Sequence, residues 1–214
     1  MPRLLTLLLT LVNALPGAVV MDRVAVVVNK HAIKSSDIQR DLRLIQFMNR
    51  EPVNLSAGEM RKAAGRLVDQ MLIRDEIGRG GYRRPSDAEA DRLLKHLVRD
   101  RFGGSEGRLD EVLSHYGLSE DQLREQFLWQ LTVLQFIDQG FRPGVQVPDE
   151  DVRAYYDQHL AEFKRENPRN NSFDALQTQI RASLEGERIN EAFAAWIEDA
   201  RKRVRIEYRE GAFQ

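Results

Sequence analysis

The chain has 214 residues, of which 42% are hydrophobic and 30% are charged, and its formal net charge is −1. This amount of apolar material is enough for a core, and the balanced charge lacks the basic excess that nucleic-acid-binding proteins usually carry. Cysteine is absent, which excludes disulfides, thiolate nucleophiles and cysteine-bound metals.

The first twenty residues differ in composition from the rest of the chain. Arg3 precedes a leucine-rich run over residues 4–12, and small residues follow up to Ala18. This order is typical of a secretory signal peptide, and the apolar run is short for a membrane span. We therefore expect residues 1–20 to be a signal peptide, cleaved after Ala14 or Ala18, and the protein to be periplasmic. An uncleaved anchor is the alternative, and only that form would contact the membrane.

Strand signals lie at the two ends of the remaining chain. Residues 24–28 are rich in β-branched side chains, which indicates a strand buried on both faces, and Ala32 and Ile33 are compatible with a short return strand. Near the C-terminus, Val204, Ile206 and Tyr208 alternate with charged residues, as in a half-buried strand. Pairing of these two ends would close the molecule.

Helical periodicity and capping signals predict helices between these ends. Ser36 is a candidate cap for the first helix, and Ser56 with Glu59 has the spacing of a capping box for the second. Glycines at 78–81 are expected to end the second helix. The predicted helices cover, in order, residues 36–48, 56–78, 85–103, 109–117, 119–139, 148–163 and a last segment that begins at Ser172.

Two of these helices have unusual apolar patterns. The helix over 119–139 is apolar on two sides, so it is either central in the fold or offers one side to a partner, and burial is the commoner reason. In the last helical segment the apolar pattern changes phase near Gly186. A kink or break is therefore expected at that glycine.

No arrangement of residues indicates catalysis or metal binding. The histidines have no partner at ligand spacing, and they are His31, His96, His115 and His159. The glycines at 78–81 follow a predicted helix rather than a strand, which favours helix termination over a phosphate loop. We therefore expect no catalytic residue, no metal and no cofactor.

Four segments carry a resemblance to a known family. They are residues 22–29 with Ile33 and 36–38, residues 67–73, residues 116–124, and residues 147–152 with Tyr155, Tyr156 and Phe163. Their order resembles the N-terminal chaperone region of SurA and the related PpiC/PpiD-type proteins. The resemblance implies a mainly α fold in which N- and C-terminal strands form a small β element. It also implies one domain over residues 21–214, with the closing helix and strand at 172–210.

Members of this family commonly carry a parvulin-type prolyl isomerase domain after the helix that contains the paired tyrosines. Here only residues 164–171 separate Phe163 from the closing segment, whereas a compact domain needs roughly 50 residues. The resemblance therefore implies a non-enzymatic chaperone that binds unfolded exported polypeptides, outer-membrane protein precursors above all. The alternatives are a prolyl isomerase and an interaction module tethered to the membrane by residues 4–12.

Candidate contacts to such a polypeptide are large apolar side chains near helix ends or on the two-sided helix. They are Phe47, Met48, Trp129, Phe136 and Phe141. Methionine adapts to varied partners, and aromatic rings offer large apolar contacts. Packing in the core is the alternative role for each of the five.

Overall fold

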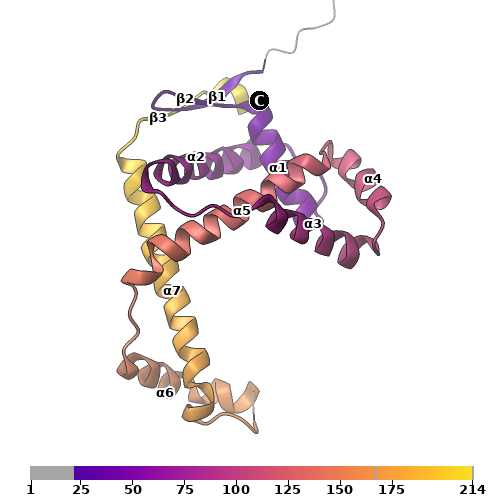
Figure 1. Ribbon diagram of the computed structural model, residues 1–214. Coiled ribbons are helices and arrows are strands. Elements are labelled where there is room, and N and C mark those ends of the chain that lie inside the picture. Colours follow the sequence, from indigo (N-terminus) through magenta and orange to yellow (C-terminus); the bar gives the residue numbers. More distant parts are fainter. Residues whose placement is uncertain (1–21, 167, 214) are drawn as a thin grey trace, which may run out of the picture.

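The computed structural model describes residues 22–166 and 168–213, so the predicted signal peptide lies outside the described residues. The fold is mainly helical with a small antiparallel sheet, as predicted (Figure 1). Within the described ranges, no helix combines the length and apolar character that a bilayer crossing requires. The elements are β1 (Val24–Val28), β2 (His31–Lys34), α1 (Ser35–Asn49), α2 (Ala57–Gly80), α3 (Asp87–Phe102), α4 (Glu106–Tyr116), α5 (Glu120–Gly140), η1 (Arg142–Gly144), α6 (Asp149–Glu166), α7 (Phe173–Lys202), β3 (Ile206–Tyr208) and η2 (Glu210–Phe213).

The sheet has the order β2-β1-β3, so the first strand is central and pairs with both the return strand and the C-terminal strand. Val28 lies opposite His31 on one side and Ile206 on the other. Asn29 takes a left-handed conformation, with φ of 52°, in the tight turn between β1 and β2. The predicted pairing of the two chain ends is confirmed.

A first core lies between this sheet and helices α1 and α2. Its buried members come from β1, β2, α1, α2, α7 and η2, and include Ala25, Val26, Ile33, Ile38, Leu42, Ala63, Ala64, Val68, Ala200 and Phe213. Because Phe213 is in η2, the last described residues of the chain fill part of a core that begins with its first strand. The sheet therefore depends on both ends of the chain.

Helices α3, α4 and α5 form a lobe beside this body, with a second core that includes Leu94, Leu109, Leu113, Leu123 and Phe127. The starts of α3 and α5 agree with the predicted helix ranges. Ser86 and Glu89 form a capping box on α3, and Ser119 forms one with Gln122 on α5.

Two predicted caps differ in detail. Ser56 is the N-cap of α2, but its side chain makes no capping hydrogen bond, and Glu59 instead pairs with Lys62 at 2.7 Å. The box predicted there is therefore not formed. The N-cap of α1 is Lys34 rather than the predicted Ser36, so this helix begins two residues earlier than expected. The Lys34 backbone N–H donates to the Asp37 carboxylate at 3.1 Å.

Of the kink or break predicted at Gly186, the break is wrong, because α7 runs without interruption from Phe173 to Lys202. Its apolar pattern changes phase because its two halves pack on different elements. Leu176 and Ile180 of the first half pack on α6, whereas Trp196 and Ala200 of the second half belong to the clusters of the body. Figure 1 shows α7 rising from α6 to the body.

Helix α6 and the first half of α7 (residues 149–184) form an arm that projects from the body (Figure 1). The arm has its own small core of Val152, Tyr156, Leu176 and Ile180. The Tyr156 hydroxyl donates to the Asn171 carbonyl at 2.7 Å and so ties the connection between the two helices to α6. The arm is thus a helical hairpin with packing of its own.

Candidate peptide-binding site

Two of the predicted contact residues, Phe47 and Met48, lie at the end of α1 against the core of the lobe. The Phe47 side chain is only 1% exposed and packs edge-on against Tyr116, with ring centroids 5.6 Å apart. Met48 is half-buried against the same core. The Phe47 ring is enclosed by the protein itself, which favours the alternative role of packing in the core over a direct contact to a polypeptide.

Phe136 is also in the core. It is 2% exposed and lies at the centre of an aromatic cluster, with ring centroids 4.9 Å from Tyr82, 5.3 Å from Trp196 and 5.6 Å from Phe141. Phe141, at the junction of α5 and η1, is half-buried. The burial of Phe136 favours the alternative role of packing in the core, where its ring holds α5 against α2 and α7.

Trp129 belongs to this same aromatic cluster but reaches a different surface. The Arg74 guanidinium lies over its ring, 4.4 Å from the centroid, a cation–π arrangement. The ring lines a pocket of about 400 Å³ between α1, α2 and α5, where most of the side chains are charged or carry amides. The structure thus groups Trp129, Phe136 and Phe141, whereas Phe47 and Met48 lie in another cluster.

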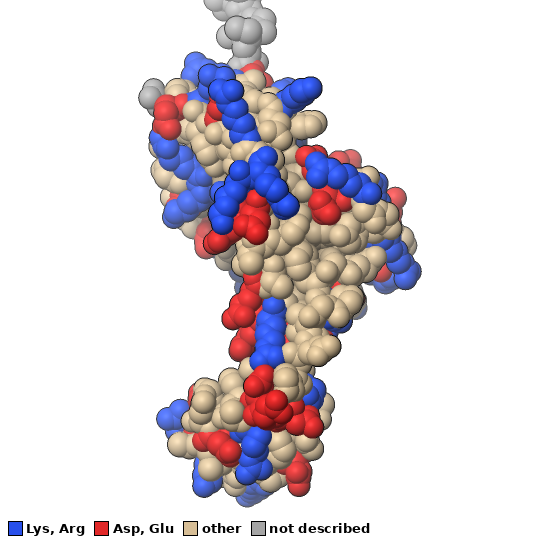
Figure 2. Space-filling model, turned by 90° about the vertical axis from the view of Figure 1, so that its left-hand side faces the viewer, with Lys and Arg blue, Asp and Glu red and all other residues tan. Residues whose placement is uncertain are grey.

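A mainly apolar hollow that could accept part of a polypeptide lies between α5 and α7. This surface, here named the α5–α7 groove, has a volume of about 460 Å³ and is lined by Leu131, Leu134, Gln135, Ile137, Asp138, Arg142, Gly186, Ile189 and Asn190. Leu134 is 63% exposed, the highest value among the described large apolar side chains. Figure 2 shows a tan area without charged side chains beside a column of charged ones, where the upper part of the molecule narrows toward the arm.

Ion pairs border this groove on one side. Arg142 pairs with Asp138 of α5 and with Glu185 of α7, the latter at 2.6 Å. The hydrogen bonds that Arg142 donates to these carboxylates, the one to Asp138 first, raise the pKa of Arg142, so its charge is retained. Two carboxylates around one guanidinium leave this border with a formal charge of −1.

Leu134 was part of one of the two apolar stripes in the predicted helix over 119–139. Burial, the commoner reason for such a pattern, holds for Leu123 and Phe127 of that stripe but fails for Leu134. No local signal separates these positions, because all of them recur at helical spacing on one side of α5.

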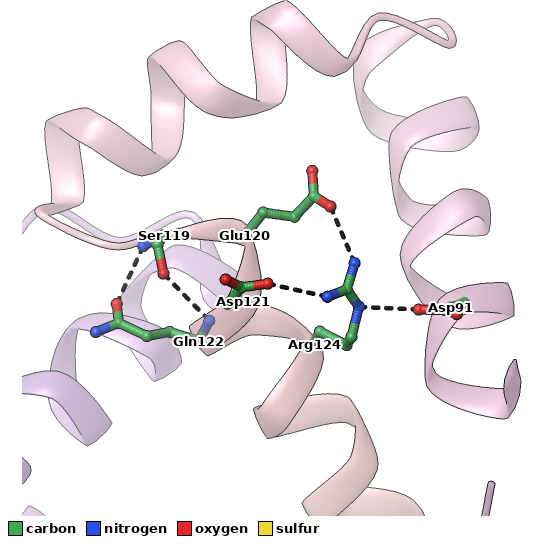
Figure 3. Close-up of polar contacts among 6 residues, drawn as sticks. All are labelled: Asp91, Ser119, Glu120, Asp121, Gln122 and Arg124. Carbon is green, nitrogen blue, oxygen red and sulfur yellow. Dashed lines mark hydrogen bonds and ion pairs between the residues drawn. The ribbon is translucent and has the colours of Figure 1, made fainter. Parts of the chain in front are cut away.

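The segment 116–124, one of those that carry the family resemblance, has a structural role (Figure 3). Arg124 at the start of α5 bonds to Asp91 of α3 at 2.9 Å, and also to Asp121 and Glu120 of its own helix. These contacts raise the pKa of Arg124, the Asp91 hydrogen bond most of all. They join α3 to α5, and the three carboxylates share a cation rather than forming an open acidic site.

Residues 22–166 and 168–213 contain no group of three or more His, Asp or Glu side chains placed to hold a metal ion. The sequence matches no protein-family model, and a comparison with curated proteins gives no significant match.

Proposed function

We propose that the protein is a periplasmic holdase, a non-catalytic chaperone related to the SurA group that binds unfolded exported polypeptides. The observation that carries this proposal is the exposed apolar groove between α5 and α7, with Leu134 at its surface. Polypeptide- and ligand-binding sites are commonly hollows lined mainly by apolar side chains, as this groove is. The order of segments that resembles the SurA group supports the same function.

Precursors of outer-membrane proteins are the proposed clients. Their strands alternate apolar and polar residues, so an extended segment presents a row of apolar side chains on one side. Burial of apolar surface contributes about 25 cal/mol per Å², so a groove of this size provides weak, reversible binding of a few side chains at a time. Such contacts hold a client soluble and still allow its release.

Prolyl isomerase activity is not supported. Helix α6 ends at Glu166 and α7 begins at Phe173, so the connection is far shorter than the roughly 50 residues of a compact domain. The proposed function therefore contains no catalytic step. A membrane-tethered module would have the same groove and would differ only in the retention of residues 4–12.

The experiment is to dilute a urea-unfolded outer-membrane protein into buffer with the exported protein and to follow aggregation by light scattering. We expect the wild type to suppress aggregation. Leu134→Glu should suppress it on the order of tenfold less well, because burying the glutamate charge against an apolar client side chain costs about as much free energy as the apolar contact contributes to binding. Leu93→Glu is the control, since Leu93 is 37% exposed on α3, outside the groove, and this variant should act like wild type.

Two results would contradict the proposal at different levels. No suppression by the wild type at molar excess refutes the holdase function itself. Equal suppression by wild type and Leu134→Glu keeps the function but moves the binding surface away from the α5–α7 groove.

A further inference from the structure

The fold gives no reason for a glycine at position 186. Gly186 lies in the middle of the uninterrupted helix α7, where glycine is less favourable than almost any other residue. A β-carbon built on it would meet no neighbouring side chain and no other element within 4 Å. Packing within the chain therefore does not require a glycine, yet its missing side chain leaves open space in the floor of the α5–α7 groove.

A second feature of the same groove is an unused hydrogen-bond acceptor. The Oε1 atom of Gln135 is buried and accepts no hydrogen bond from any residue that the structure describes. Buried polar atoms without partners are rare and unfavourable. Gln135 also lines the groove, so a rotation of its side chain would turn this oxygen toward a bound molecule.

The chemistry of the groove distinguishes between an extended occupant and a helical one. A carbonyl oxygen without a donor is complementary to a backbone N–H, and an extended chain has free N–H groups along its length. The interior of a helix has none, since its N–H groups are bonded within the helix. The formal charge of −1 at the Asp138, Arg142 and Glu185 border is complementary to a basic residue in the same extended segment.

From these observations we propose that the α5–α7 groove binds one extended polypeptide segment that places a bulky apolar side chain against Gly186 and donates a backbone N–H to Oε1 of Gln135. A basic residue beside the apolar one faces the acidic border. This inference rests on the proposed holdase function and specifies which segment of a client the groove accepts.

The first test fills the space beside Gly186. Binding of a fluorescein-labelled peptide that alternates leucine and serine, with one flanking lysine, is measured by anisotropy. Gly186→Leu should weaken binding about tenfold or more, because the new side chain occupies the position of the peptide leucine. The same change should raise the melting temperature of the free protein, because leucine favours a helix over glycine. Gly107→Leu, at the exposed start of α4 with no neighbour within 4 Å, is the control and should leave binding unchanged.

The second test addresses the hydrogen bond. Gln135→Met keeps the length of the side chain and removes the acceptor. We expect about three- to tenfold weaker binding of the peptide, and no fall in melting temperature, because an unpaired polar atom is removed from the free protein. A set of peptides in which an ester replaces one amide at a time should include one that loses affinity for the wild type but not for Gln135→Met.

The outcomes separate this inference from the proposed function. If the wild type neither binds the peptide nor suppresses aggregation, the holdase function is refuted. If it does both and neither Gly186→Leu nor Gln135→Met weakens peptide binding, the extended-segment site is refuted and the holdase function stands. Loss of binding together with a lower melting temperature in both variants would assign the two residues to folding and would also refute the site.

Discussion

Asp41 shows how a single buried carboxylate joins two helices of the body. Its side chain is 6% exposed on α1, and it accepts hydrogen bonds from Arg66 at 2.9 Å and from Gln70 at 3.2 Å, both on α2. Burial raises the pKa of Asp41 above its ordinary value of 3.8, and the charge of Arg66 opposes this shift. Ionised Asp41 is therefore stabilised by the hydrogen bonds from Arg66 and Gln70, but destabilised by its removal from water.

The direction of this pKa shift predicts how stability depends on pH. Because the folded protein holds the Asp41 proton to a higher pH than the unfolded chain, the contribution of Asp41 is greatest below pH 3.8 and is lost as the pH rises through the raised pKa. Asp41→Asn removes this titration. We expect the stability of the wild type relative to Asp41→Asn to fall as the pH rises from 3.8 through the raised pKa of Asp41, measured by urea unfolding of both proteins. If the stability of the wild type relative to Asp41→Asn instead increased with pH, the ion pair with Arg66 would affect the pKa of Asp41 more strongly than burial does.

The aromatic residues show that the type of a side chain does not determine its exposure. Phe47, Phe136, Phe141 and Trp129 are all plausible binding residues by type, but two of them are core and the others are half-buried. Leu134, which the sequence does not distinguish from its buried neighbours, is the exposed one. The side-chain type indicates what a residue can contribute, but not whether it reaches the surface.

Among the elements, α7 has the most divided role. Its first half belongs to the arm and its second half to the body, and Arg181 and Arg188 bind the carbonyls of Val147 and Gln146 in the linker before α6. The arm core is small and separate from the core around the sheet. The arm should therefore open without unfolding of the body, as a locally cooperative unit.

Val152→Ala tests this independence, because Val152 is fully buried in the arm core. Removing its methyl groups should destabilise the arm by about 1.5–3 kcal/mol. Native-state hydrogen exchange should then show faster exchange of the α6 amides, with unchanged exchange in α1 and α2. Equal acceleration in the body would show that arm and body unfold as one unit.

At the scale of the whole molecule, the packing of the C-terminal segment against the sheet and its core should contribute a large part of the free energy of unfolding. Strand β3 covers one edge of β1, and Phe213 of η2 is buried in the core beneath the sheet. Loss of a buried phenylalanine side chain costs about 3–5 kcal/mol. That amount is a large fraction of the 5–15 kcal/mol that typically separates a folded domain from its unfolded chain.

Removal of residues 205–214 should therefore abolish cooperative thermal unfolding, or lower the melting temperature strongly, as followed by circular dichroism. Phe213→Leu, which keeps most of the apolar volume, should cost less and leave the transition cooperative. An unchanged melting temperature of the truncated protein would show that the helices alone sustain the fold.

The sequence by itself determined the features that depend on neighbouring residues. The caps at Ser86, Ser119 and Ser172 and the left-handed glycines at Gly103 and Gly117 are set by contacts within a few residues or by the conformational freedom of glycine. The strands at both ends follow from their β-branched or alternating patterns. Such local signals can be recognised in the sequence without knowing how the elements pack.

Only the tertiary structure decided the rest. It showed that α7 continues through Gly186, that Phe47 and Phe136 are enclosed, and that Leu134 is open beside α7. The physical reason is that burial depends on which elements meet, and these contacts join residues far apart in the chain. An apolar stripe therefore indicates that a surface needs a partner, whereas the fold determines whether the protein itself provides that partner or leaves the surface free.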